Sequence, residues 1–356
     1  MILEGSGLGR TRSESPCGRS RRRLLRLRAV VSFLLLASLV LGAGCGDVPS
    51  PQNGEISDGL AEQIAGGVNL ERMMETIRFL AGEELAGRAT GSSQSAVLEE
   101  YLRDRLQDLG LEPVDLLGLS DFRQPFQVPA DRCYLDREAR PDELVEAANL
   151  LGMMRGETED MVILTANYDG LGRDPQSGEV YPGADYNASG VSAVLEAAAV
   201  LSSLEETPRK TLVFALLGGE ECGGFGASAL AETLEEKGFR GRVRIINLEG
   251  LGAGDGNYMD VWDLNYRPNR ETVRALEEAA EALGVTLELG GADPGTSAGT
   301  FFMYHFPAVT CDWSWFERTE HPDFHRVTDT PERINREGLL QVTRVAALAA
   351  WLLATE

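Results

Sequence analysis

Short apolar stretches alternate along this chain with longer stretches of helical periodicity. MVILTAN at 161–167, TLVFALL at 211–217 and VRIINL at 243–248 have the length and apolar content of buried strands. The helical pattern predicts helices over 70–83, 92–109, 191–204, 226–237, 271–283 and 336–353. This alternation indicates an α/β fold, a single domain whose mostly parallel mixed central sheet is flanked by helices on both faces.

The N-terminal region has the pattern of an export signal. A basic stretch, RSRRRLLRLR at 19–28, precedes a largely apolar run of twelve residues at 30–41 and then small residues before Gly44 and Cys45. A run of twelve residues is too short to span a membrane as a helix. We therefore predict a signal peptide over 1–44.

The segment LGAGC resembles a bacterial lipoprotein cleavage site, although Gly42 stands where leucine is usual. This resemblance predicts that Cys45 is lipidated and that the protein is exported to the bacterial cell envelope on a lipid anchor. A simple cleaved signal, which would give a soluble secreted or periplasmic protein, is the alternative. Residues 45–68 are polar and rich in Gly, Pro and Ser, and we expect a flexible tether there, followed by one domain over 69–356.

The charge balance narrows the range of partners. The formal net charge is −23, and because the first 44 residues hold eight Arg and two Glu, the remainder is more acidic still. Nucleic acids bind through cationic patches, so an acidic surface argues against them. It also argues against membrane contact except through the N-terminal lipid.

The cysteines leave one question open. Cys17 belongs to the signal and Cys45 is the predicted lipid site, so Cys133, Cys222 and Cys311 remain. An odd number in an exported protein allows one disulfide among the three, and the sequence does not choose the pair. We expect Cys222 to be a small buried residue and not a thiolate ligand.

Acidic residues follow the predicted strands. Glu220 and Glu221 lie in LLGGEECGGFGAS directly after one strand, and Glu249 follows another. Asn167 ends a third strand, and Asp185 lies in the loop before a predicted helix. The strand-to-loop boundary is where ligands bind in open α/β sheets. Of two adjacent acids there, one can hold a metal while the other moves a proton.

Five segments in order resemble zinc-dependent exopeptidases, the family of bacterial leucyl aminopeptidases, glutamate carboxypeptidase-like enzymes and glutaminyl cyclases. The shared motifs of that family read roughly HxD, GADDNxSG, GEExGxxGS, NxDxxG and YHxxxDT. In this chain they are NYD, GADYNASG, GEECGGFGA, NLEGLG and FHRVTDT. The resemblance extends over about residues 70–353 and implies the family's α/β fold.

The resemblance also implies roles. Asp185 matches the aspartate that bridges two zinc ions, and Glu220 matches the general base. Glu221 and His325 match ligands of one of the two ions. This set is intact, and with a water it meets the needs of a catalytic zinc.

The other metal position is altered. Asn167 stands where the family has a histidine, Glu249 where it has an aspartate, and Tyr186 where it has the second aspartate of GADD. These residues would offer only oxygens, which suit magnesium, manganese or calcium better than zinc. We therefore expect one firmly bound zinc, with the second position empty or holding a harder divalent ion. Asp169 and Asp329 are expected to brace the site from behind its ligands.

These features predict a metallo-exopeptidase, most simply an aminopeptidase, acting on peptide substrates with Glu220 as general base. A single-zinc amidase or cyclotransferase like the glutaminyl cyclases is one alternative, and a binding protein on a disabled peptidase fold is another. Of the other histidines, we expect His305 to be structural, whereas His321 could swing in to replace the lost ligand. Substrate preference is expected to depend on two loops, 258–269 and 290–302, and the oligomeric state is open.

Overall fold

The computed structural model describes residues 58–133, 143–174, 176–252, 254, 256–291, 295–313 and 322–356. The predicted signal peptide over 1–44, the lipidation site at Cys45 and the alternative ligand His321 lie outside these residues. The described part belongs to one compact unit, Gly54–Glu356.

The core of the molecule is a mixed sheet in the order β1-β3-β5-β4-β6-β9-β7-β8, with β2 paired to β3. The central strands β5, β4, β6 and β9 run parallel, and antiparallel pairs extend the sheet on both sides. The predicted α/β fold with a mixed central sheet is confirmed. The strands are β1 Glu112–Pro113, β2 Arg123–Pro129, β3 Leu144–Met154, β4 Thr158–Asn167, β5 Lys210–Leu217, β6 Val243–Leu248, β7 Met259–Trp262, β8 Leu287–Leu289 and β9 Ala308–Trp313.

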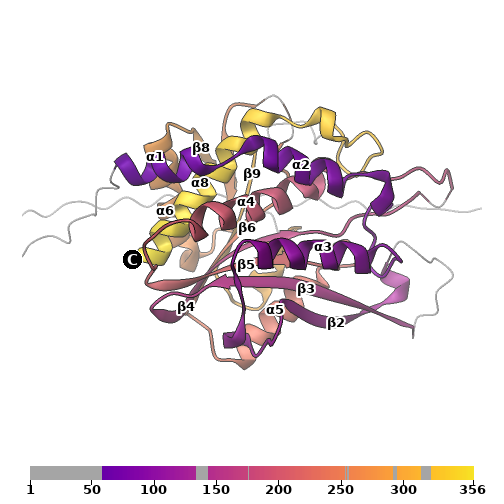
Figure 1. The fold of residues 1–356 in the computed structure, drawn as a ribbon, viewed down its shortest axis with the longest axis horizontal. Helices are drawn as coiled ribbons and strands as arrows, with labels where there is room; N and C mark the ends of the chain where they lie inside the picture. Colours follow the sequence, from indigo (N-terminus) through magenta and orange to yellow (C-terminus); the bar gives the residue numbers. More distant parts are fainter. Residues whose placement is uncertain are drawn as a thin grey trace, which may run out of the picture. The chain divides into compact units, whose positions relative to one another are not determined.

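Helices cover both faces of the sheet (Figure 1), with α1, α2, α4 and α8 on one side and α5 on the other. The six predicted helices are all present, with ends that differ by a few residues. The helices are α1 Asp58–Gly67, α2 Leu70–Leu80, α3 Ser95–Asp108, α4 Gly190–Ser202, α5 Phe225–Glu236, α6 Arg270–Leu283, α7 Ser297–Met303 and α8 Arg336–Thr355.

Each strand contributes alternate residues to two apolar cores. In β4, Val162 and Leu164 pack under α4 and α8, whereas Ile163 between them faces the core formed with α5 and α7. Side chains alternate between the faces of a strand, so continuous apolar strands require cover on both sides. Within the described part, α8 is the one helix apolar and long enough by composition to cross a membrane, and most of it is buried in this core.

The predicted tether over 45–68 was too long. Residues 58–67 form α1, which packs against α8, with Ala61 and Ile64 buried. Arg344 of α8 donates a hydrogen bond from Nε to the carbonyl oxygen of Ala65. The Gly and polar residues around this short helix hid its apolar face, which is stabilised by tertiary packing and not by its own propensity.

Two segments predicted as loops also contain regular structure. Residues 258–269 include β7, and residues 290–302 include most of α7. Both elements are short, and β7 joins the sheet by pairing with β8 and β9. Segments of four to seven residues carry too little periodicity to be assigned from the sequence.

We predict that α1 contributes to the stability of the fold. The substitution Ile64→Ala removes a fully buried side chain and should lower the free energy of unfolding by about 2–4 kcal/mol. The exposed neighbour Gln63→Ala is the matched control, with an expected change within about 0.5 kcal/mol. Urea denaturation followed by circular dichroism measures both, and equal midpoints for Ile64→Ala and wild type would show that α1 is dispensable.

Candidate functional site

The predicted site residues collect along one edge of the sheet, where three neighbouring parallel strands end. Asn167 is the last residue of β4, and Glu249 directly follows β6. Glu220 and Glu221 follow β5 after two glycines. Because β5, β4 and β6 are neighbours in the sheet, their carboxyl ends bring these side chains to one region.

Asp169 holds the turn that carries the two glutamates. Its Oδ1 accepts a hydrogen bond from the backbone N–H of Glu220, and its Oδ2 accepts one from the N–H of Glu221, both at 3.1 Å. The hydroxyl of Thr90 donates to the same Oδ2 at 2.9 Å. Asp169 therefore fixes the backbone of Glu220 and Glu221.

His325 and Glu221 come together. Nε2 of His325 lies 3.4 Å from Oε1 of Glu221, whose side chain is only 7% exposed. That oxygen is buried and, among the described residues, has no hydrogen-bond donor. The His325 ring stacks on Phe324 and meets the edge of Tyr186. A small cavity of about 10 Å³ lies beside it.

Asp185 is held by two other segments. The Asp329 carboxylate accepts the backbone N–H of Asp185 at 2.8 Å and that of Tyr186 at 3.0 Å, while Gly252 N–H donates to Oδ1 of Asp185 at 2.6 Å. The turn can approach β6 because α4 begins with Gly190, where a Cβ atom would collide with the Leu248 carbonyl oxygen.

The three predicted zinc ligands are only partly assembled. Among the described residues, no group of three Asp, Glu, His or Cys side chains is arranged closely enough to hold a metal ion. His325 and Glu221 are in place, whereas one oxygen of Asp185 is bound to the Gly252 amide. His325 itself is on a partly exposed loop, with its side chain 36% exposed.

The oxygens of Asn167 and Glu249, the predicted ligands of the second metal position, accept hydrogen bonds within the protein. The amide oxygen of Asn167 accepts a hydrogen bond from Asn187 at 2.8 Å. Oε1 of Glu249 accepts from Asn247 at 2.7 Å, and its Oε2 accepts from the Tyr186 hydroxyl at 2.9 Å. The oxygens expected to bind a cation are thus engaged in hydrogen bonds within the protein.

Arg88 is an important residue that sequence reasoning missed. Its side chain is 2% exposed and donates hydrogen bonds to the carbonyl oxygens of Leu80, Tyr168, Pro182 and Gly183. Burial lowers its pKa to about 10, so the group remains a cation at neutral pH. Its positive charge interacts with the carboxylates of Asp329, Asp169 and Glu221. The segment AGRATGS gave no periodic signal, because these partners are close only in the folded chain.

Burial of several acids together alters their protonation. Burial, and then the charge of Glu221, raise the pKa of Asp169 to about 7. Burial, followed by the charges of Glu249, Glu221 and Asp169, raises the pKa of Glu220 well above its ordinary value. A cation at this edge of the sheet would offset the repulsion between these acids.

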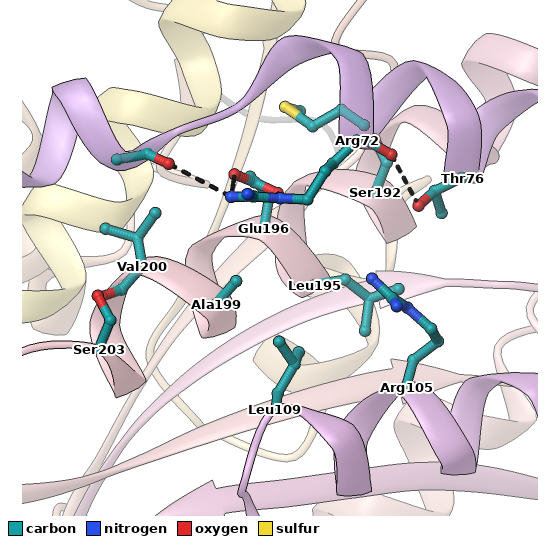
Figure 2. A pocket seen from close by; sticks show the side chains of 12 residues that line it. Arg72, Thr76, Arg105, Leu109, Ser192, Leu195, Glu196, Ala199, Val200 and Ser203 are labelled. Atoms are coloured by element: carbon teal, nitrogen blue, oxygen red, sulfur yellow. Dashed lines mark hydrogen bonds and ion pairs between the residues drawn. The ribbon is translucent and has the colours of Figure 1, made fainter.

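A larger cavity of about 400 Å³ lies between α2, α3 and α4 (Figure 2), and none of the candidate site residues lines it. Arg72 of α2 bonds Glu196 of α4 at 2.6 Å beside it, and Arg105 of α3 reaches toward it from the other side. The candidate chemistry is therefore at the sheet edge and not in this cavity.

The chain is similar in sequence to known peptidases. The chain is 28% identical over 222 residues to aminopeptidase YwaD of Bacillus subtilis, a match that covers 57% of this chain and 44% of that protein. It is 33% identical over 157 residues to a probable zinc metalloprotease of Leptosphaeria maculans, covering 41% of this chain and 34% of the relative. The chain thus spans less than half the length of these two curated relatives.

Solved structures have the same fold. An aminopeptidase from Aneurinibacillus sp. strain AM-1 superimposes with a TM-score of 0.66 at 17% identity, covering 83% of this chain and 96% of that chain. A glutaminyl cyclase from Bacteroides thetaiotaomicron gives 0.61 at 17% identity, covering 80% and 98%. A family model also matches residues 149–350, more than half of the chain and the region that contains the site from Asn167 to Asp329. The chain belongs to peptidase family M28.

Proposed function

We propose that this protein is a zinc-dependent exopeptidase, an aminopeptidase that removes N-terminal residues from peptides. The observation that carries the proposal is the pairing of Glu221 with His325. Two ligands on one tetrahedral zinc, each bonded at 2.0–2.1 Å, are separated by about 3.3 Å. Oε1 of Glu221 and Nε2 of His325 are 3.4 Å apart, and the oxygen is buried without a hydrogen-bond donor among the described residues.

The same residues support one zinc and not two. Asp185, Glu221 and His325 supply two carboxylates and one imidazole, a donor set that zinc prefers. Asp185 would complete the set by turning its carboxylate from the Gly252 amide. The second position lacks a histidine, and the oxygens of Asn167 and Glu249 already accept hydrogen bonds. We propose that it holds no second zinc.

In this proposal Glu220 moves the proton. A bound zinc ion supplies Lewis acidity, which polarises the scissile carbonyl and makes water acidic enough to lose a proton near neutral pH. The carboxylate of Glu220 accepts that proton and returns it to the leaving amine. Asp169 keeps the Glu220 backbone in position for this transfer.

Location and partners follow from the N-terminal segment and the charge. We propose a lipid anchor at Cys45 and exposure to peptides at the cell envelope, without nucleic-acid partners. Similarity to an aminopeptidase and to a probable zinc metalloprotease supports the peptide substrate and the metal. The single intact donor set also favours a second candidate, a one-zinc cyclotransferase that closes N-terminal glutamine.

We predict about one zinc per purified chain. His325→Asn should lower the bound zinc to well below half, because imidazole is the sole nitrogen donor of the set. His305→Asn is the matched control, since both histidines are exposed and adopt positive φ angles, 54° and 64°, which asparagine tolerates. Elemental analysis after mild dialysis measures both variants. Two zinc ions of similar affinity, or zinc retention in His325→Asn, would contradict the one-site assignment.

We also predict that Glu220→Gln lowers kcat on aminoacyl anilides by at least about 100-fold while zinc is retained, because the amide cannot accept a proton. Glu236→Gln, an exposed change on α5, should leave kcat unaltered. The readouts are release of the aniline and of the free amino acid. Ring closure of N-terminal glutamine without peptide hydrolysis would select the cyclotransferase, and loss of neither activity in Glu220→Gln would remove this residue from the mechanism.

A further inference from the structure

Two buried cysteine sulfurs lie against each other directly behind the glutamate turn. The Sγ atoms of Cys133 and Cys222 are 2.8 Å apart, well inside the van der Waals contact of two sulfurs. Each residue is 5% exposed, and they share a small apolar cluster with Val128 and Ala147. Packing alone does not bring two thiols this close.

The two cysteines come from distant parts of the chain. Cys133 follows the short 3-10 helix Ala130–Arg132 at the end of β2, and Cys222 directly follows Glu221. They are 89 residues apart in sequence. The third cysteine of the described part, Cys311, is fully buried in β9. The folded chain thus selects one pair from the three cysteines that the sequence left open.

We propose that Cys133 and Cys222 form a disulfide bond in the exported protein. The two S–H bonds break and one S–S bond forms, releasing two protons and two electrons. A disulfide oxidant, either a dithiol–disulfide oxidoreductase or a small-molecule disulfide, takes up both and is reduced to two thiols. Because both sulfurs are buried in the folded state, the bond forms during folding and is then shielded from reductants.

This bond would anchor the turn that carries Glu220 and Glu221. The loop that it closes contains Asn167, Asp169 and Asp185, and it ends one residue after Glu221. Asp169 holds the same turn through backbone N–H groups, so the disulfide adds a covalent attachment to β2. The bond itself is independent of the proposed function, whereas its effect on zinc affinity rests on it.

The bond can be detected directly in the purified full-length protein. Free thiols are alkylated in denaturant without reductant, the chain is digested, and the peptides are identified by mass spectrometry. We expect a cross-linked pair that contains Cys133 and Cys222, and an alkylated Cys311. Alkylation of both Cys133 and Cys222 in protein isolated from an oxidising compartment would overturn the proposal.

Variants test the consequence for stability. Closing a loop of this length should raise Tm by roughly 5–10 °C, so Cys133→Ser and Cys222→Ser should each lower it by that amount. The double variant should be no less stable than either single variant, because both remove one bond. Cys311→Ala is the control, because it removes a buried thiol and should leave the Cys133–Cys222 cross-link intact in the same peptide analysis. Additive losses in the double variant would show two independent packing effects and no bond.

A measurement of zinc affinity distinguishes the disulfide proposal from the proposed metallopeptidase function. In Cys222→Ser we expect the affinity for zinc to fall about tenfold, as when support behind a metal ligand is lost. Cys311→Ala should bind zinc as wild type does. A cross-linked peptide in a protein that binds no zinc would support the disulfide and reject the metallopeptidase. Unchanged affinity in Cys222→Ser would reject the positioning role.

Discussion

The crowding of carboxylates at the ends of three parallel strands is the constraint on which the site depends. Burial, and then the charges of neighbouring acids, raise the pKa of Asp169 and of Glu220; Glu221 contributes to both shifts and Glu249 to that of Glu220. Like charges in such surroundings are destabilising unless cations or N–H donors offset them. Backbone amides of the glutamate turn and the buried guanidinium of Arg88 provide part of that offset. A metal ion bound by Glu221 and His325 would offset more of this repulsion. The same cation would therefore favour both the stability of the fold and the proposed catalysis.

At the altered metal position, the buried polar groups are stabilised by hydrogen bonds within the protein. A buried carboxylate such as Glu249 needs partners, and the hydroxyl of Tyr186 and the amide of Asn247 supply them. Asn187 does the same for Asn167. Two of the three altered residues, Tyr186 and Glu249, are therefore bonded directly to each other. Reversing Tyr186 alone would remove a hydrogen-bond donor from the buried Glu249 carboxylate, which costs free energy.

The sequence was sufficient for the elements with strong patterns and for the positions at their ends. The apolar runs of β4, β5 and β6 predicted strands, and strand ends predicted where acidic residues would meet. The tether boundary was wrong because α1 depends on packing against α8. The Arg88 contacts could not be predicted, since they join carbonyl groups up to 95 residues away. The hydrogen bonds that occupy Asn167 and Glu249 were missed for the same reason, because side-chain partners across a sheet leave no local pattern.

The loop before α8 connects two members of the proposed zinc set, His325 and Asp185. It carries His325 and, four residues later, Asp329, whose carboxylate holds the backbone of Asp185 and Tyr186. A movement of this loop would therefore shift the imidazole and the Asp185 turn together. Glu221 is tied independently, through Asp169, to the other side of the site. In the proposed centre His325 and Glu221 already meet, so completion of the set depends on the Asp185 carboxylate turning from the Gly252 amide, while Asp329 keeps the backbone of Asp185 in place.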